Sequence, residues 1–410
     1  MIPRRLSALL AGAALLVSSL GSPGARALAA ATPIPSGVPL SQVRPVVGAV
    51  AWDGGKTVAP WVWEQRFPEA RSIGGLVQTL GDDPLILRNA PLDYEWQVTT
   101  DGKTWRTLPE TRVRNERRRV RIFRLGFPVR ASGLRLVVAS IRDQRPVVQS
   151  LEILERPDAN VRLAPWVLVV NSTEDPKLPG HGQEFIPLVR SCPGYENAGA
   201  QQIWVADLEP GFLKAEPAPL AVFLSGTFKD WCQVDRSHWR GVERILAAPT
   251  VPMWASCGGA QALAIIADSG TARAWDCPHC RDEDRPRTPI YGHIGHTGQG
   301  RLACGDYAQC TFEKGPKAIV TAATEPLFEG MPPSFQVMQS HCGQLNYAPD
   351  GWDVVAGGGE GALTRIQCLR KRGHLVYAAQ FHIEMAGTPE TSRQLMVNFL
   401  RLARHSLTAP

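Results

Sequence analysis

The chain has 410 residues, of which 44% are hydrophobic and 20% charged, with 9 cysteines and a formal net charge of +6. This profile excludes a disordered tail and a collagen, and the length exceeds that of one typical domain. Residues 1–40 carry +3 and residues 41–157 carry +6, which leaves −3 for residues 158–410. Because the basic charge belongs to the first third of the chain, a nucleic-acid-binding enzyme with a basic catalytic groove is disfavoured.

The first residues have the pattern of an export signal. Arg4 and Arg5 precede an apolar stretch at 6–20, and small-x-small cleavage sites follow at 25–29. We therefore expect a signal peptide over 1–31, a Pro/Ser-rich linker over 32–47, and an exported protein, periplasmic or extracellular. The arginine pair is compatible with both a Sec and a twin-arginine signal. No later run reaches the ~20 apolar residues of a membrane helix, so we expect no transmembrane segment.

The next hundred residues read as an all-β domain. Short alternating runs at 94–98 and 134–138 are separated by turn residues, and Asp101-Gly102 lies between two strands as in a hairpin. The order of these segments resembles the discoidin (coagulation factor 5/8 type C) family. That resemblance implies a β-sandwich over 48–155 whose end loops bind glycans, phospholipid head groups or other proteins.

The predicted sandwich contains a basic segment with two interpretations. Nine arginines fall between residues 112 and 135 against the single acidic residue Glu116. They predict either a patch for an anionic glycan or membrane surface, or a solvated hairpin whose arginines lie on alternate faces. No aromatic residue interleaves with Arg117-Arg118-Arg119, so these residues offer no platform for stacking nucleic-acid bases.

A linker over 156–164 separates the sandwich from a segment of different character, residues 165–405. Continuous apolar runs at 166–170, 220–224, 252–256 and 375–381 are typical of buried parallel strands. Helical patterns follow two of them, at 259–266 and 391–404. This alternation predicts an α/β domain, with a parallel, flavodoxin-like sheet covered by helices on both faces. Ligands of such sheets bind at the carboxyl ends of the strands.

One cysteine lies at such a strand end. Cys257 follows the run at 252–256 and precedes the helical segment, with Gly258 and Gly259 directly after it. This is the context of a nucleophile elbow, where a helix N-terminus lowers the pKa of a thiol and the next backbone N–H can hold an oxyanion. A single cysteine in a glycine-rich turn is also compatible with a structural role.

A histidine and a carboxylate follow another strand. His382 can transfer the proton that a thiol nucleophile requires, and Glu384 can orient the imidazole. These two motifs resemble those of the class I glutamine amidotransferase family, over about residues 165–405. The family pattern Gly-x-Cys-x-Gly-x-Gln is matched by Cys257, Gly259 and Gln261, and Gln-x-His-Pro-Glu is matched by Gln380, His382 and Glu384.

The resemblance implies further site residues and a chemistry. Gly226 in Ser225-Gly226-Thr227 would join Gly258 in the oxyanion hole, and His341 corresponds to a substrate-side histidine. Two departures are Ala255 for the first glycine and Ile383 for proline, which we expect to loosen the turn between His382 and Glu384. The implied activity is hydrolysis of a glutamine or γ-glutamyl amide through a thioester, related to γ-glutamyl hydrolases and needing no cofactor. Transfer to an amine acceptor, and a retired scaffold in a surface-binding protein, are the alternatives.

The other eight cysteines suggest disulfide bonds in an exported protein. Four lie in an expected insertion at about 271–312 and can form two local disulfides, a zinc site or a redox-active pair, namely Cys277, Cys280, Cys304 and Cys310. The remaining four can form two more bridges of undetermined pairing, namely Cys192, Cys232, Cys342 and Cys368.

Overall fold

The computed structural model describes residues 50–51, 59–83, 85–161, 163–173, 182–214, 216–227, 229–271, 290–295, 310–322 and 324–408. The predicted signal peptide (1–31) and linker (32–47) lie outside these residues. Most of the predicted insertion does as well, including Cys277, Cys280 and Cys304. Among the helices of the described ranges, none combines the length and hydrophobicity needed to cross a membrane.

The N-terminal part is an antiparallel sheet, as the alternating runs predict. Its order is β1-β6-β2-β5-β3-β4. The strands are β1 (Val50–Ala51), β2 (Trp61–Leu80), β3 (Pro91–Thr99), β4 (Arg106–Thr107), β5 (Val120–Ile141) and β6 (Val147–Leu154). These strands form one hydrogen-bonded sheet, which confirms the prediction of an all-β domain.

Two long strands explain how a single sheet encloses a core. β2 and β5 pair over most of their length, with shifts in register between Arg66 and Arg71 and between Ile73 and Gly75. Such irregularities bend a strand and increase its twist. Phe123 from the first half of β5 and Leu136 from its second half belong to the same buried cluster. The bent strands therefore serve both layers of a sandwich-like body.

The C-terminal part is built on a mixed sheet of the order β13-β12-β15-β16-β17-β10-β9-β7-β8. The strands of its parallel portion are β7 (Trp166–Asn171), β8 (Gly199–Trp204), β9 (Ala221–Leu224), β10 (Met253–Ser256) and β17 (Val376–Ala379). The antiparallel portion comprises β12 (Glu313–Thr321), β13 (Ser334–His341), β15 (Trp352–Gly358) and β16 (Ile366–Lys371). The prediction of a parallel sheet is thus correct for the portion that carries Cys257 and wrong for the remainder.

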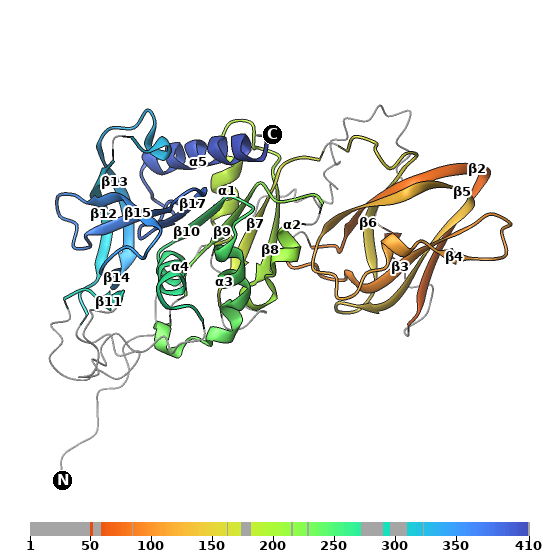
Figure 1. Cartoon of the computed structure of the whole chain (residues 1–410), viewed down its shortest axis with the longest axis horizontal. Coiled ribbons are helices and arrows are strands. Elements are labelled where there is room, and N and C mark those ends of the chain that lie inside the picture. Colours follow the sequence, from red (N-terminus) through yellow and green to blue (C-terminus); the bar gives the residue numbers. More distant parts are fainter. Residues whose placement is uncertain are drawn as a thin grey trace, which may run out of the picture. The chain divides into compact units, whose positions relative to one another are not determined.

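Helices cover both faces of this sheet, as predicted. Side chains of α3 (Arg240–Ala247) and α4 (Gly258–Ser269) join Leu168 of β7 in one buried cluster. Side chains of α1 (Phe185–Arg190) and α5 (Glu390–Thr408) join Val169 of β7 in the other. Figure 1 shows α1 and α5 on one side of the sheet and α3 and α4 on the other. Neighbouring residues of a strand point to opposite faces, which is why β7 alternates between the two cores.

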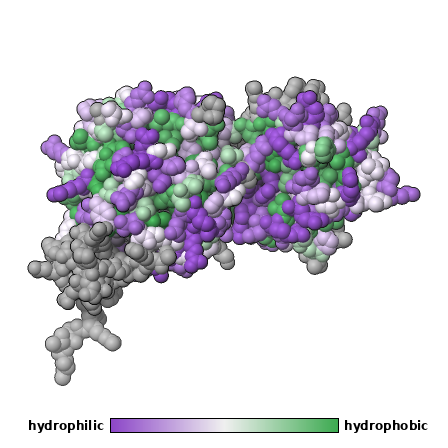
Figure 2. Space-filling model, in the orientation of Figure 1, coloured by the Kyte–Doolittle hydropathy of each residue, from purple (hydrophilic) through white to green (hydrophobic). Residues whose placement is uncertain are grey.

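Shorter elements complete the C-terminal part. The helix α2 (Pro210–Lys214) precedes β9, and a two-stranded antiparallel pair consists of β11 (Tyr291–His293) and β14 (Gly343–Leu345). Single turns of 3-10 helix lie at Pro109–Thr111, Val205–Asp207, Trp231–Gln233, Arg236–Trp239 and Pro326–Phe328. The face drawn in Figure 2 mixes hydrophilic and hydrophobic residues over both parts of the chain.

The arginine-rich segment does not present a continuous basic surface. Four of its nine arginines form ion pairs with carboxylates, namely Arg112 with Glu95, Arg117 with Asp207, Arg121 with Glu116 and Arg124 with Glu216. Arg118 is 2% exposed, and its guanidinium lies over the rings of Trp166 and Phe212. The interpretation of a solvated hairpin is therefore wrong for Arg118, which aromatic rings distant in sequence cover, whereas Arg112, Arg114 and Arg130 are exposed as that interpretation predicts.

Candidate functional site

Cys257 lies in a strained turn between a central strand and a helix. β10 ends at Ser256 and α4 begins at Gly258, and Cys257 between them has φ 50° and ψ −115°. A non-glycine residue rarely adopts a positive φ, and such strain is concentrated at functional sites. The Cys257 N–H donates to the carbonyl of Ala379 at 2.7 Å, which fixes the turn to the end of β17. The elbow predicted from the sequence is present.

The turn packs directly against the loop that follows β9. A Cβ built on Gly226 would lie 2.8 Å from the nitrogen of Gly258, and one built on Gly258 would lie 3.0 Å from the nitrogen of Thr227. Only glycine permits this approach of two backbones. The two residues predicted to form an oxyanion hole, Gly226 and Gly258, are therefore neighbours.

A serine that has no distinguishing motif in the sequence orients this loop. The Ser172 hydroxyl lies 3.1 Å from the carbonyl oxygen of Ser225 and 2.7 Å from that of Gly226. In a trans peptide the N–H points away from the carbonyl, so these bonds direct the N–H groups of Gly226 and Thr227 away from Ser172. The position of Ser172 directly after an apolar run was its only signal in the sequence.

The predicted base and its orienting carboxylate are together. His382 Nδ1 lies 2.7 Å from Glu384 Oε1, and the two side chains are 13% and 4% exposed. A backbone bond from the His382 N–H to the carbonyl of Met338, at 2.9 Å, ties this segment to β13. These two contacts hold the turn, and the expectation that Ile383 loosens it relative to proline stays a prediction.

Electrostatics couple His382 to Cys257. Burial alone lowers the pKa of His382, because desolvation disfavours the imidazolium. The negative charges of Cys257 and Glu384, together with hydrogen bonds to both side chains, outweigh burial and raise the pKa of His382 well above its usual value. This is the environment expected for a thiolate–imidazolium pair.

Gln261 supports the site from behind. It is 5% exposed, its Oε1 accepts from Trp231 Nε1 at 3.1 Å, and its Nε2 donates to Gln380 Oε1 at 3.2 Å. Gln380 Nε2 in turn lies 3.9 Å from Cys257 Sγ. The structure therefore gives Gln261 protein partners, and it brings Gln380, to which the sequence alone assigned no role, closer to the sulfur.

His341 is not free to meet a ligand. Its Nδ1 lies 2.8 Å from the carbonyl oxygen of Gly343, and its Nε2 lies 2.9 Å from Gln339 Oε1 and 3.3 Å from Glu313 Oε2. Burial raises the pKa of Glu313, but hydrogen bonds, including one with His341, outweigh it and lower that pKa. The neighbour of His341, Ser340, reaches the site instead, with its carbonyl oxygen 3.9 Å from Cys257 Sγ.

The prediction that the other cysteines form disulfide bonds is wrong for Cys192, Cys342 and Cys368. These three cysteines and Cys257 have free thiols. Cys232 is disulfide-bonded. Because Cys192, Cys342 and Cys368 are free thiols, two bridges among the four cysteines outside the insertion are excluded. Within the described ranges, no group of three or more His, Cys, Asp or Glu residues could hold a metal ion.

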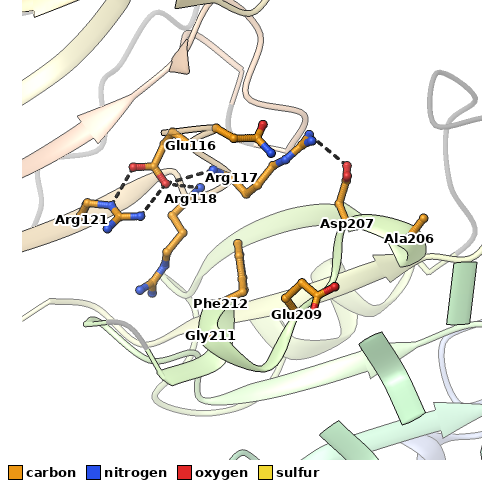
Figure 3. Close-up of a pocket in the computed structure, with 10 residues that line it drawn as sticks. Glu116, Arg117, Arg118, Arg121, Ala206, Asp207, Glu209, Gly211 and Phe212 are labelled. Atoms are coloured by element: carbon orange, nitrogen blue, oxygen red, sulfur yellow. Dashed lines mark hydrogen bonds and ion pairs between the residues drawn. The ribbon is translucent and has the colours of Figure 1, made fainter. Parts of the chain in front are cut away.

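A pocket of about 370 Å³ lies elsewhere, between the arginine-rich segment and the residues around α2 (Figure 3). Its charged walls largely neutralise each other, since Arg121 pairs with Glu116 at 2.7 Å and Arg117 with Asp207 at 3.1 Å. None of its lining residues belongs to the Cys257 site. The pocket therefore contributes nothing to the chemistry of that site.

Comparison with known proteins places the fold of this site in a family. Residues 213–402 match the family model of "Glutamine amidotransferase class-I", so the C-terminal part of the chain carries a class I glutamine amidotransferase domain. "GMP synthase [glutamine-hydrolyzing]" of Thermus thermophilus is 39% identical over 87 residues, which are 21% of this chain and 16% of that synthase. The protein of the same name from Thermomicrobium roseum is 33% identical over 107 residues, 26% of this chain and 18% of that synthase. The chain thus spans less than a fifth of the length of either synthase.

Two solved structures are also similar. A protein described as one subunit of a GMP synthase, from Thermoplasma acidophilum, has a TM-score of 0.42 and 16% identity, covering 60% of this chain and 96% of that chain. A glutamine amidotransferase from Thermotoga maritima has a TM-score of 0.37 and 14% identity, covering 60% of this chain and 85% of that chain.

Proposed function

We propose that the C-terminal domain is a thiol-dependent hydrolase of glutamine or γ-glutamyl amides, with Cys257 as nucleophile, His382 as acid and base, and Glu384 as the orienting carboxylate. The observation that carries this proposal is the strained position of Cys257, coupled to a His382 whose Nδ1 lies 2.7 Å from Glu384. The similar bacterial synthases are named "glutamine-hydrolyzing", which supports glutamine as a substrate of this domain.

In the first half of the proposed reaction, the sulfur of Cys257 attacks the amide carbonyl carbon. The resulting oxyanion accepts hydrogen bonds from the N–H groups of Gly258 and Gly226, a role supported by the close approach of the two backbones. His382 then gives its proton to the leaving nitrogen. The C–N bond breaks, ammonia or an amine departs, and a γ-glutamyl thioester remains on Cys257.

In the second half, water replaces the departed amine. His382 removes a proton from the water as it attacks the thioester, the C–S bond breaks, and glutamate leaves with the thiolate restored. An amine that took the place of this water would make the same intermediate a transferase. The reaction is therefore decided by the acceptor, and we propose water as the acceptor.

The experiment follows both products. The protein and its Cys257→Ala variant are incubated with glutamine and with γ-glutamyl peptides, and ammonia and free glutamate are measured. We expect release by the wild-type protein and none by Cys257→Ala, whereas Cys192→Ala, which removes a buried free thiol elsewhere, retains activity. Hydroxylamine added as acceptor separates the candidates, since an excess of hydroxamate over glutamate favours transfer. No release from any substrate, and no labelling of Cys257 by a glutamine-analogue electrophile, would sink the proposal and favour a retired scaffold.

We also propose that the protein is exported and that its N-terminal domain binds a surface ligand, such as an anionic glycan. The signal-like residues 1–31 support export, and the net charge of +6 over residues 41–157 supports an anionic ligand. Because four of the arginines are already ion-paired, the attraction for a polyanion should be modest and sensitive to salt. Elution from a heparin column only at high salt concentration would contradict that expectation.

A further inference from the structure

The orienting carboxylate of the site is held on both of its oxygens. Oε1 of Glu384 lies 2.7 Å from His382 Nδ1. Oε2 accepts two hydrogen bonds, from the Ser256 hydroxyl at 3.1 Å and from the Ile383 N–H at 2.9 Å. Two donors on one oxygen fix the rotation of the carboxylate and leave the other oxygen for the histidine.

The hydroxyl of Ser256 is itself oriented. Trp254 Nε1 donates to Ser256 Oγ at 3.0 Å. A hydroxyl carries one proton, so an oxygen that accepts from an indole directs that proton to another acceptor, here Glu384. Ser256 and Trp254 are both 0% exposed, so no bulk water competes for the bond.

The second donor depends on a departure from the family pattern. That pattern has proline between the histidine and the glutamate, and proline has no N–H. Ile383 has a backbone N–H, which donates a hydrogen bond to Glu384 Oε2. Ser256 occupies a position that the family pattern leaves open, directly before Cys257. Of the two donors to this oxygen, the Ile383 N–H exists because of a departure from the family pattern, and the Ser256 hydroxyl comes from a position that the pattern does not fix.

We infer that Ser256, held by Trp254 and assisted by the Ile383 N–H, is a positioning residue of the Cys257 site, keeping Glu384 Oε1 on His382 Nδ1. The expected effect of Ser256 on turnover rests on the proposed function, whereas its expected effect on the reactivity of the Cys257 thiol does not. Ser256 acts through Glu384 and touches no substrate in this arrangement. Its removal should therefore lower kcat and leave KM unchanged.

Removal of the hydroxyl should also narrow the pH range in which the ion pair exists. With a less well oriented carboxylate, the imidazolium of His382 is less stabilised, so the pair forms at a higher pH and loses its proton at a lower pH. The pH profile of kcat is bell-shaped when both forms of the pair matter, and both of its limbs then move inward. A merely structural role for Ser256 would reduce the amount of active protein without moving either limb.

The test uses Ser256→Ala, the conservative Ser256→Thr, and Ser392→Ala as a matched control. Ser392 is a buried serine of α5 whose hydroxyl has no hydrogen-bond partner. The rate of Cys257 alkylation by iodoacetamide and the kcat for glutamine are measured across pH. For Ser256→Ala we expect kcat about tenfold lower, since a hydrogen bond to a charged group is lost, with a pH profile of kcat narrowed on both limbs. Alkylation needs only the thiolate, so its profile should differ in the acid limb alone, which should move to higher pH. Ser256→Thr should retain the wild-type kcat and the wild-type alkylation profile, and so should Ser392→Ala.

An unchanged alkylation profile in Ser256→Ala would overturn the inference. If Ser256→Ala does not fold, Ser256→Thr and Ser256→Val decide, because they have the same shape and differ in the hydroxyl; equal profiles would overturn the inference. Because alkylation needs no substrate, an acid limb of alkylation shifted in Ser256→Ala, found together with no amidase activity in the wild type, would refute the proposed function and leave the role of Ser256 standing.

Discussion

Among single residues, the thiol of Cys257 differs in its surroundings from the other free thiols of the described residues. Cys257 lies half-buried in a strained turn beside His382. Burial raises the pKa of Cys192 to about 11 and that of Cys342 to about 12, and it raises the pKa of Cys368 as well. The latter thiols are therefore protonated at neutral pH, and only a thiolate is a good nucleophile.

This contrast predicts selective alkylation. At a pH of about 7, iodoacetamide should modify Cys257 well before Cys192, Cys342 or Cys368, because burial keeps those three thiols protonated. Peptide mapping by mass spectrometry measures the order. Modification of any of these three cysteines ahead of Cys257 would show that the site does not activate its thiol.

The coupling between Cys257 and His382 predicts a titration. In Cys257→Ala the charge that raises the pKa of His382 is removed, so this pKa should fall, observed by NMR of the imidazole. In the wild type the pKa of folded His382 is above the usual 6.5, so the stabilisation from this imidazolium is complete below pH 6.5 and is lost as the pH rises through the folded value. An unchanged titration of His382 in Cys257→Ala would mean that the two groups do not interact.

At the scale of elements, the site depends on two loops that meet through glycine. Gly226 follows β9 and Gly258 begins α4, and neither position has room for a Cβ. The predicted oxyanion hole needs Gly226 and Gly258 close together, and this contact keeps them so. The loop after β9 and the start of α4 therefore contribute to the site by holding their two backbones close together. Side-chain substitutions away from this contact should leave that distance unchanged.

A methyl group should break that contact. Gly258→Ala places a Cβ 2.9 Å from the Cα of Gly226, so the loops must separate and an oxyanion donor is displaced. We expect kcat to fall about a hundredfold, as for loss of one oxyanion donor. Gly211→Ala in α2 is the matched control, because no atom lies within 4 Å of its Cβ. Full activity of Gly258→Ala would remove this loop from the mechanism.

The elements that position the site were predictable, whereas much of the sheet was not. Apolar runs identified β7, β9, β10 and β17, because a buried parallel strand is hydrophobic on both faces. The antiparallel strands β12 and β13 are exposed on one face, and in β15 and β16 buried and exposed residues follow no simple alternation. The pairing of β12 with β15 also joins residues far apart in the chain. A local pattern contains no information about such pairing.

At the scale of the whole molecule, contacts join the arginine-rich segment to the C-terminal part of the chain. Arg124 binds Glu216 through two parallel bonds, with Nε 2.8 Å from Oε2 and Nη2 2.7 Å from Oε1. Gln201 Nε2 donates to the carbonyl of Arg117 at 2.6 Å. The positive charge of the first domain is thereby partly neutralised by acidic residues of the second.

This contact predicts a coupling energy. In a double-mutant cycle, Arg124→Ala and Glu216→Ala should be non-additive by about 0.5–1 kcal/mol in the free energy of unfolding, as expected for a bidentate but partly exposed pair. Denaturation by urea measures it. Strict additivity would show that the two side chains do not meet in solution.

The sequence could not reveal this neutralisation, because the partners of Arg117 and Arg124 lie about ninety residues further along the chain. It did contain the catalytic candidates: Cys257, His382 and Glu384 lie where their motifs predict, since each follows a strand of the parallel portion. Ser172 and Ser256 were not recognised as members of the site, because a serine after a strand has no distinguishing pattern until its hydrogen bonds are known.

In the proposed mechanism, Cys257 forms a γ-glutamyl thioester. The most direct measurement is the mass of the intact protein after acid quenching during turnover of glutamine. We predict an added mass of one γ-glutamyl group, located on the peptide that contains Cys257, sensitive to hydroxylamine and absent from Cys257→Ala. Turnover of glutamine by Cys257→Ala, or wild-type turnover with the adduct on another residue, would contradict this account.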